Sequence, residues 1–250
     1  MLAVLALEAG RTLSYAALAD ELYSDEPPEK LDNALQANAT RLRKVLRGSN
    51  GEPALLRAVR NGYMLDIPPS HVDTTRFLQL AAEGNRSLPD SPRRAISLFE
   101  EALQMWRGPA LLDAGDGLIC RSAAARLEEA RLTLWEDLIS AWIMLREGRR
   151  ILSDLCQLTE QYPLRERFWE QLMLVLYRSG QQSEALNVFH RIRQRLDEEL
   201  GVAPKPFLCR RYEEILAQDP GLMAPDVVTR WRQDYIAEAR LAQHGRRNPR

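Results

Sequence analysis

Apolar residues recur at helical spacing through the first third of the chain. Residues 1–9 form a short apolar run that ends at Gly10, and residues 15–23 follow Ser14, a residue type that caps helices. From residue 31 onward, leucine and alanine return every three or four positions, which places them on one side of a helix. The pattern therefore predicts three helices, over residues 1–9, 15–23 and 31–47. The inward side of the third helix is formed by Leu31, Leu35, Ala39, Leu42 and Leu46.

Two short apolar runs follow the third predicted helix and lie on either side of Asn61-Gly62. Asn-Gly between two such runs is a strong signal for a tight turn that joins two antiparallel strands. We therefore predict a β-hairpin over residues 54–67, and Pro68-Pro69 ends this part of the chain. The first segment thus reads as helix, turn, helix, turn, helix and hairpin.

The remainder of the chain shows helical spacing and no strand pattern. Helices are predicted over residues 77–83, 93–106, 121–145, 150–161, 166–178 and 183–200, with glycine and proline between them. Within them, Leu145-Arg-Glu-Gly148 matches Tyr177-Arg-Ser-Gly180 at an offset of 32 residues. This offset is close to the 34-residue period of tetratricopeptide repeats, which stack helical hairpins into an array. Residues 226–242 are also helical by pattern and lead into a basic tail.

The outward side of the third helix is rich in basic, amide and hydroxyl side chains, which are the types that bind nucleic acids. The whole chain has a net charge of −1, but the interval from Asn33 to Tyr63 holds six basic residues and only Glu52 as an acid. Arginine, lysine, asparagine, glutamine and threonine hydrogen-bond phosphates and base edges. A solvated helix face is the alternative reading of such a charge run, and the basic hairpin directly after it favours DNA. The candidate DNA-binding residues are Asn33, Gln36, Thr40, Arg41, Arg43, Lys44 and Arg47 on the helix, with Arg57 and Arg60 on the hairpin.

These elements define a mainly α fold. We predict a winged helix-turn-helix domain with a short C-terminal β-hairpin over residues 1–68. An all-α tetratricopeptide-like domain follows over residues 71–222, and a C-terminal helix with a basic tail occupies residues 223–250.

Composition and motif content argue against catalysis and against a membrane protein. Cys120, Cys156 and Cys209 are widely spaced and form no metal or disulfide pattern, and no Gly-x-x-x-x-Gly-Lys-Ser/Thr phosphate loop is present. No apolar run approaches the roughly 18 residues of a membrane helix. The opening residues 1–7 are too short for a signal peptide and lack a basic start. We therefore expect a cytoplasmic protein that is not an enzyme, needs no cofactor and has no membrane partner.

The order of the two segments resembles the Streptomyces antibiotic regulatory protein family of transcriptional activators. The N-terminal resemblance rests on Asn33-Ala-Leu-Gln36, Arg41-Leu-Arg-Lys44 and Asn61-Gly-Tyr-Met-Leu65. The C-terminal resemblance rests on Val72-Asp73, Arg76-Phe77, Tyr162-Pro-Leu-Arg-Glu-Arg167, Leu176-Tyr-Arg-Ser-Gly180, Glu184-Ala-Leu186 and Glu198-Glu-Leu-Gly201. Members of this family join a winged helix to a bacterial transcriptional activation domain.

The resemblance implies a mechanism and a set of partners. Such activators bind direct repeats that overlap the −35 region of promoters in secondary-metabolite gene clusters, and they recruit RNA polymerase through its sigma factor. Binding to tandem half-sites implies self-association on DNA. By analogy with related winged helices, the acidic loop over residues 24–29 would contact the polymerase.

One departure from the family pattern suggests an alternative function. Family members begin with a few short strands before the first helix, whereas this sequence begins inside that helix. The resemblance therefore implies either that the natural start lies upstream or that this N-terminal sheet is missing. The alternative is a helical-repeat interaction scaffold whose truncated N-terminal module does not bind DNA.

Overall fold

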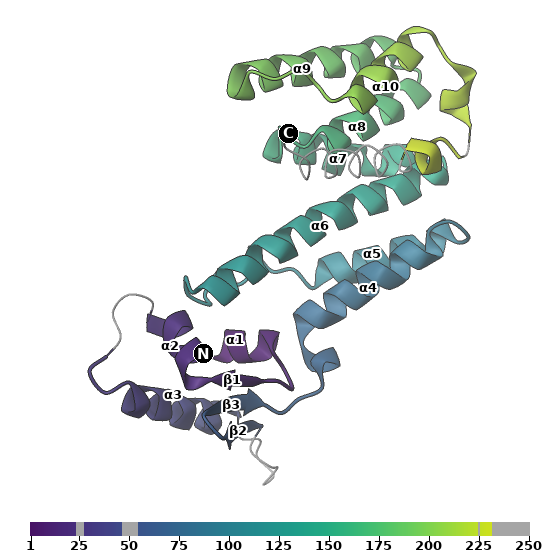
Figure 1. Ribbon diagram of the computed structural model, residues 1–250. Helices are drawn as coiled ribbons and strands as arrows, with labels where there is room; N and C mark the ends of the chain where they lie inside the picture. The colour runs from purple at the N-terminus through teal and green to yellow at the C-terminus, as the bar shows by residue number, and fades with distance from the viewer. Residues whose placement is uncertain (24–27, 47–54, 225, 232–250) are drawn as a thin grey trace, which may run out of the picture. The chain divides into compact units, whose positions relative to one another are not determined.

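The computed structural model of the chain describes residues 1–23, 28–46, 55–224 and 226–231 (Figure 1). The chain forms two compact units, one made of Met1–Glu83 with Glu100–Leu134 and the other of Gly84–Phe99 with Trp135–Arg250. The domain boundary near residues 68–71 stays a prediction, because the first unit also contains the segment Glu100–Leu134.

The N-terminal elements follow the order α1 (Leu2–Leu7), β1 (Thr12–Ser14), α2 (Tyr15–Tyr23), α3 (Leu31–Leu46), β2 (Leu56–Val59) and β3 (Gly62–Leu65). The three predicted helices are confirmed. Helix α2 begins directly after Ser14, whose Oγ accepts a hydrogen bond from the amide of Ala17 at 3.1 Å, as expected of an N-cap. Arg47 and most of the acidic loop over residues 24–29 lie outside the described residues.

The predicted hairpin is present as β2 and β3, and a third strand that was not predicted pairs with it. Strand β1 pairs antiparallel with β3, so the three strands form a sheet in the order β1-β3-β2. In this register Leu13 lies opposite Tyr63, and Ser14 lies opposite Gly62. A strand of three residues is too short to show an alternating pattern, so only the pairing with β3 identifies it.

The turn of the hairpin lies one residue earlier than Asn61-Gly62. Val59 pairs with Gly62, which leaves Arg60 and Asn61 as the loop, and Asn61 has a left-handed φ of 63°. Gly62 belongs to β3, and a Cβ added there would overlap the carbonyl oxygen of Leu13 on β1. The glycine is therefore required by the close approach of two strands rather than by the turn.

One apolar core holds these N-terminal elements together. Leu5 of α1, Leu18 of α2 and Leu35 of α3 are buried in one cluster, together with Leu65 of β3. The start of a later helix joins the same core through Cys120. Burial of this apolar surface fixes the position of α3 against the sheet.

The remaining elements are helical throughout the described part of the chain. They are η1 (Pro69–His71), α4 (Asp73–Ser87), α5 (Pro92–Gln104), α6 (Leu118–Met144), η2 (Gly148–Ile151), α7 (Leu152–Gln161), α8 (Glu166–Arg178), α9 (Gln182–Leu200), α10 (Pro206–Leu216) and η3 (Pro220–Met223). The bounds of α8 are those predicted from the sequence, and α4 extends beyond the predicted 77–83 at both ends. Helix α10 was not predicted, although a proline in the first turn, here Pro206, is compatible with a helix start.

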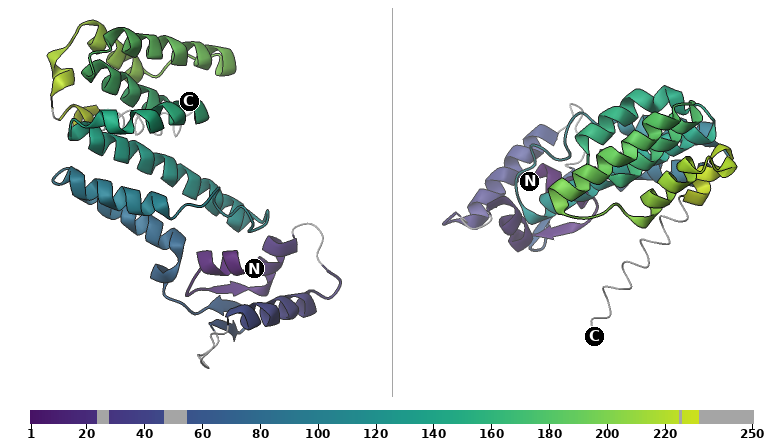
Figure 2. Two further views of the ribbon diagram at one scale, coloured as in Figure 1. Left: turned by 180° about the vertical axis from the view of Figure 1, so that it is seen from behind. Right: turned by 90° about the horizontal axis from the view of Figure 1, so that it is seen from above.

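The second unit contains two helical hairpins. Helix α8 packs against α7 and α9, and α10 packs against both α8 and α9 (Figures 1 and 2). Ala185 is fully buried, which lets α9 approach its neighbours closely. This arrangement agrees with the predicted tetratricopeptide-like helical domain.

Buried ion pairs stabilise the second unit. The Glu170 carboxylate of α8 lies between two buried guanidinium groups, accepting hydrogen bonds from Arg167 and, at 3.1 Å, from Arg211 of α10. Arg211 also forms a 2.6 Å ion pair with Glu214 and stacks on the ring of Trp231, 4.5 Å from its centroid. Burial alone raises the pKa of Glu170, and the two arginines oppose that change.

None of the helices in the described residues is long and apolar enough to cross a lipid bilayer. The same residues hold no cluster of three or more histidine, cysteine, aspartate or glutamate side chains that could bind a metal ion.

Candidate DNA-binding surface

Helix α3 has one buried side and one solvent-facing side. Leu35 and Ala39 are 1% and 0% exposed, and Leu31, Leu42 and Leu46 pack against the same core, as the apolar spacing predicted. Asn38 lies toward the core as well, where its amide nitrogen donates to the Tyr23 hydroxyl at 3.0 Å. The packing therefore fixes which side of α3 is free to meet a ligand.

The outer face of α3 is exposed and mainly polar. It consists of Asn33, Gln36, Ala37, Thr40, Arg41, Lys44 and Val45, all of them exposed. These positions follow one another at intervals of three and four residues, so they line one side of a helix roughly 24 Å long, at about 1.5 Å per residue. Five of the predicted DNA-binding residues are thus brought together: Asn33, Gln36, Thr40, Arg41 and Lys44.

Arg43 differs from the other basic residues of α3. Its Nε donates to the carbonyl oxygen of Leu56 on β2 at 3.1 Å, and its guanidinium lies 5.7 Å from the centroid of the Tyr63 ring. The side chain is half-buried and ties α3 to the sheet. Arg43 therefore connects the helix to the hairpin and does not belong to the outer face.

The hairpin presents two exposed arginines. Arg60 lies in the two-residue loop between β2 and β3, and Arg57 lies on β2. Arg57 forms a 2.5 Å ion pair with Asp66, and both side chains remain substantially exposed. An exposed pair of this kind contributes little to stability, so the arginine can exchange its partner for a phosphate.

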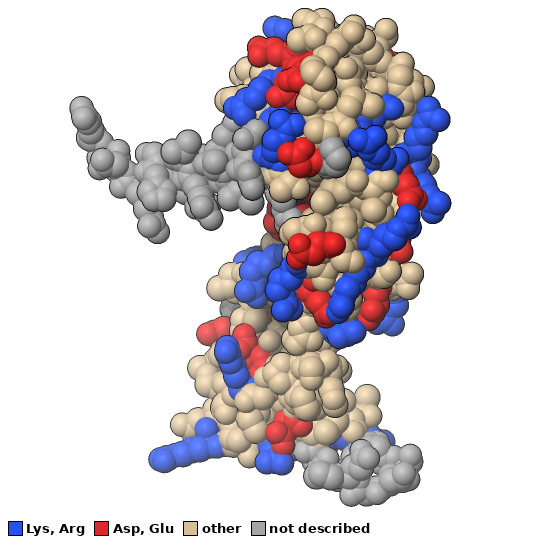
Figure 3. Space-filling model, turned by 90° about the vertical axis from the view of Figure 1, so that its right-hand side faces the viewer, with Lys and Arg blue, Asp and Glu red and all other residues tan. Residues whose placement is uncertain are grey.

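The outer face and the hairpin loop carry uncompensated positive charge. Among the described residues, Arg41, Lys44 and Arg60 pair with no carboxylate. In the space-filling view, Lys and Arg side chains project from the surface at the bottom of the picture, and acidic side chains lie nearby (Figure 3). Exposed cations without acidic partners attract a polyanion.

Val45 is a residue that the pattern analysis missed. Its side chain is 77% exposed on the outer face, next to Lys44 and four positions after Arg41. An apolar side chain among DNA-facing polar groups can contact a thymine methyl group in the major groove. An isolated valine on the polar side of an amphipathic helix was the only available signal.

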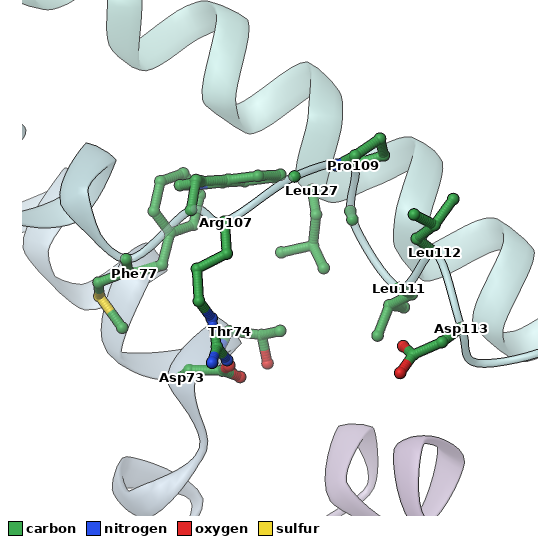
Figure 4. A pocket seen from close by; sticks show the side chains of 13 residues that line it. Asp73, Thr74, Phe77, Arg107, Pro109, Leu111, Leu112, Asp113 and Leu127 are labelled. Carbon is green, nitrogen blue, oxygen red and sulfur yellow. The ribbon is translucent and has the colours of Figure 1, made fainter.

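A cavity of about 600 Å³ lies beside α4, α6 and the segment after α5 (Figure 4). Phe77, Trp106 and Leu127 form its apolar part, and Arg107 points toward Asp73 and Thr74. Its main groups already have structural partners, because Trp106 packs edge-to-face on Phe77, at a centroid distance of 5.3 Å, and stacks with Arg131. Asp73 accepts the amide hydrogen of Thr74 at the start of α4. The cavity residues therefore serve the local packing.

Two family models cover most of the chain. Residues 1–65 match the model described as transcriptional regulatory protein, C terminal, and residues 72–216 match the bacterial transcriptional activator domain. The chain is 50% identical over 238 residues to the transcriptional regulator RedD of Streptomyces coelicolor, covering 94% of this chain and 67% of that protein. It is 37% identical to the regulatory protein DnrI of Streptomyces peucetius, covering 88% and 83% of the two chains.

A solved structure shares the same architecture. The chain is similar to Mycobacterium tuberculosis EmbR, solved in complex with a low-affinity phosphopeptide, with a TM-score of 0.86 and 28% identity. The match covers 97% of this chain and 63% of the EmbR chain. DNA binding and transcription regulation are thus supported at the level of the family. With both domains matched in this order, the chain belongs to the Streptomyces antibiotic regulatory protein family of transcriptional regulators.

Proposed function

We propose that the chain is a sequence-specific activator of a secondary-metabolite gene cluster. It binds direct repeats near the −35 element of its promoters and recruits RNA polymerase through the sigma factor. Two copies occupy tandem half-sites, and their self-association takes place on DNA. The protein acts on the nucleoid, in the cytoplasm. It controls transcription initiation by RNA polymerase and is not itself an enzyme.

The observation that carries this proposal is the outer face of α3. Arg41 and Lys44 are exposed there, have no carboxylate partner among the residues that the structure describes, and lie on the same face as the amides of Asn33 and Gln36. Asparagine and glutamine read adenine edges, arginine reads guanine, and lysine and arginine bind phosphates. The buried side of α3 meanwhile holds the helix rigidly against the sheet, as a base-reading element requires.

In this proposal the helix and the hairpin have different roles. Helix α3 enters the major groove with its outer face, where Val45 contacts a thymine methyl group. Arg57 and Arg60 reach the sugar-phosphate backbone or the minor groove from the hairpin. Most of these contacts are to phosphate, so binding weakens steeply as salt is raised.

Fluorescence anisotropy with a labelled promoter duplex from the gene neighbourhood tests the proposal. We expect binding to exceed that of a scrambled duplex by at least about 10³-fold at physiological salt. Arg41→Ala with Lys44→Ala should weaken binding by at least about tenfold. The matched control is Arg121→Ala with Arg126→Ala, which removes the same charge from exposed positions of α6 and should leave the affinity unchanged.

The spacing of the half-sites provides a second test of the same proposal. Inserting about 5 bp between the repeats turns one half-site to the opposite side of the duplex, since a helical turn is about 10.5 bp. Cooperative binding should then be lost, while binding to a single half-site remains. Equal losses from the α3 variant and the α6 control would contradict sequence-specific binding by α3.

The interaction scaffold remains the competing function. It predicts no preference for the promoter duplex at any salt concentration. In that case promoter activation in cells would also be insensitive to the Arg41 and Lys44 substitutions.

A further inference from the structure

The two repeat-like segments of the sequence place an arginine at equivalent positions. Arg146 lies in Leu145–Gly148, directly after α6, and Arg178 lies in Tyr177–Gly180, as the last residue of α8. Both residues line one cavity of about 260 Å³ in the second unit, together with Arg149 of η2. Arg146 and Arg149 are exposed and Arg178 is half-buried, so three arginines line one partly open cavity at the ends of α6 and α8.

In the described part of the chain, the guanidinium group of Arg178 donates its hydrogen bonds to backbone carbonyl groups. It donates to the carbonyl oxygens of Leu222 at 2.8 Å, Ile143 at 3.1 Å and Ala224 at 2.6 Å. These bonds join the end of α8 to the end of α6 and to η3. They fix the orientation of Arg178 but supply only partial negative charge, including that of the C-terminal end of α6.

The other two arginines also have only neutral acceptors. Arg146 donates to the carbonyl oxygen of Met223 at 3.2 Å, and Arg149 donates to the hydroxyl and the carbonyl oxygen of Ser179, both at 3.2 Å. Among the described residues, no carboxylate pairs with any of the three arginines.

The nearest acid in the sequence is already engaged elsewhere. Glu147 lies between Arg146 and Gly148, but it forms ion pairs with Arg93 and with Arg150, each at 2.9 Å. Within the described part of the chain, Glu147 therefore supplies no counterion to the cavity arginines.

The positions of Arg178 and Arg146 are unfavourable for the free energy of folding, the first for electrostatic reasons and the second because of its backbone conformation. Burial lowers the pKa of Arg178, and the positive charge of Arg146 lowers it further, although a guanidinium stays charged in proteins. Arg146 also adopts a left-handed φ of 60°, at a helix end where glycine is the usual residue. The chain thus keeps a charged side chain where glycine would fit with less strain, beside another cation.

We infer that Arg146, Arg149 and Arg178 form a binding site for a dianionic phosphate group. Guanidinium groups have five N–H donors in a planar fork that matches phosphate oxygens, and each of these three has donors left over. A dianion offsets more of the clustered charge than a single carboxylate does. The Ser179 hydroxyl supplies an additional polar group at the cavity wall.

The size of the cavity limits the ligand. At about 260 Å³ it is smaller than the roughly 300–1,000 Å³ of sites for drug-sized molecules, so it accommodates a phosphate with at most a short substituent. The ligand is therefore inorganic phosphate or a small phosphate monoester. Bound there, it would join the ends of α6 and α8 to η3, making the helical domain responsive to phosphate. This inference does not depend on DNA binding by α3.

Isothermal titration of the full chain with inorganic phosphate, against chloride at equal ionic strength, tests the site. We expect saturable phosphate binding that Arg146→Gly or Arg149→Gln weakens by at least about tenfold, because each removes charge-assisted hydrogen bonds. Arg146→Gly should not lower the melting temperature, since glycine favours the left-handed conformation. Arg178 is not substituted, because its backbone hydrogen bonds hold η3.

Arg191→Gln is the matched control, since Arg191 is an exposed arginine of α9 away from the cavity residues. It should leave phosphate binding unchanged. Glycerol phosphate in place of inorganic phosphate distinguishes the two sources, because tighter binding of the ester identifies an organic phosphate as the ligand and weaker binding identifies free phosphate. Phosphate heats that equal those of chloride, or equal phosphate affinity for the parent and both cavity variants, would overturn the inference.

Discussion

Basic side chains in the two domains of this protein face opposite environments. On the outer face of α3 and in the hairpin loop, Arg41, Lys44 and Arg60 are exposed and have no carboxylate partner among the described residues. In the helical domain, Arg167 and Arg211 are 5% and 3% exposed and both bind Glu170. The same residue type therefore takes part in a buried ion network around Glu170 and remains available to a ligand on the outer face of α3.

This difference shows that counting arginines along the sequence does not locate a binding surface. A buried guanidinium loses its hydration and needs a carboxylate or carbonyl partner. An exposed guanidinium stays hydrated and can bind a phosphate when one is present. Arg167 and Arg211 have a carboxylate partner in Glu170, whereas Arg41, Lys44 and Arg60 have none among the described residues. The cavity arginines Arg146, Arg149 and Arg178 donate to carbonyl and hydroxyl oxygens and likewise pair with no carboxylate there.

Removing the central acid of the buried network should have the largest effect on stability. Glu170→Ala leaves Arg167 and Arg211 buried without their shared carboxylate, and we expect a loss of about 3–5 kcal/mol in unfolding free energy. Urea denaturation followed by tryptophan fluorescence measures it. Glu184→Ala is the control, because its ion pair with Arg191 is half exposed on both sides and should contribute less than about 1 kcal/mol. Equal losses would show that burial does not govern these pairs.

The N-terminal domain has one buried acid among its described residues, and its loss should have an intermediate effect. Glu21 is 8% exposed and accepts the amide hydrogens of Ile119 at 2.7 Å and Cys120 at 2.8 Å, at the start of α6. We expect Glu21→Ala to cost about 1–3 kcal/mol, as for other charge-assisted hydrogen bonds.

The reactivity of the Cys120 thiol provides a second measurement of the effect of Glu21→Ala. Burial, together with the neighbouring Glu21, raises the pKa of the Cys120 thiol to about 11. Glu21→Ala should therefore lower this pKa and speed alkylation of Cys120 at mildly alkaline pH, with unchanged labelling of the exposed Cys156. Glu8→Ala, which removes a partly exposed acid paired with the exposed Arg11, should change neither stability nor labelling.

The smallest effects are expected for two nearby arginines of α3, Arg43 and Arg41, whose substitutions should differ in their effects on stability and on the salt dependence of DNA binding. Arg43→Ala removes a hydrogen bond to Leu56 and a contact with the Tyr63 ring, so it should lower stability by about 1 kcal/mol and leave the salt dependence of DNA binding unchanged. Arg41→Ala should do the reverse, reducing the salt slope by about one with little change in stability. If Arg43→Ala instead reduced the salt dependence of DNA binding, Arg43 would contact a DNA phosphate.

Local pattern in the sequence was sufficient for most of the fold. Helical periodicity located α2, α3 and α8, and the Ser14 cap and the two strands of the hairpin were also found, because each signal lies within a few residues. The same periodicity divided α3 into its buried side and its outer face. All five residues that the structure brings together on the outer face, Asn33, Gln36, Thr40, Arg41 and Lys44, were among the nine predicted from the sequence.

Long-range contacts decided the rest. Strand β1 exists because it pairs with β3, and Gly62 is needed because Leu13 approaches it, so neither can be recognised from neighbouring residues. Arg43 was assigned to DNA by its place on the helix, yet its side chain reaches Leu56, which follows thirteen residues later.

The sequence by itself determined where helices form, which side of α3 is apolar, and the repeat that places arginine at both Arg146 and Arg178. Only the tertiary structure decided which arginines have partners. Periodicity is set by neighbouring residues, whereas the charge environment of a guanidinium depends on groups that folding brings from distant parts of the chain. Glu170 beside Arg211 and the carbonyl oxygens around Arg178 are two such environments, and the first stabilises the fold while the second leaves positive charge for a ligand.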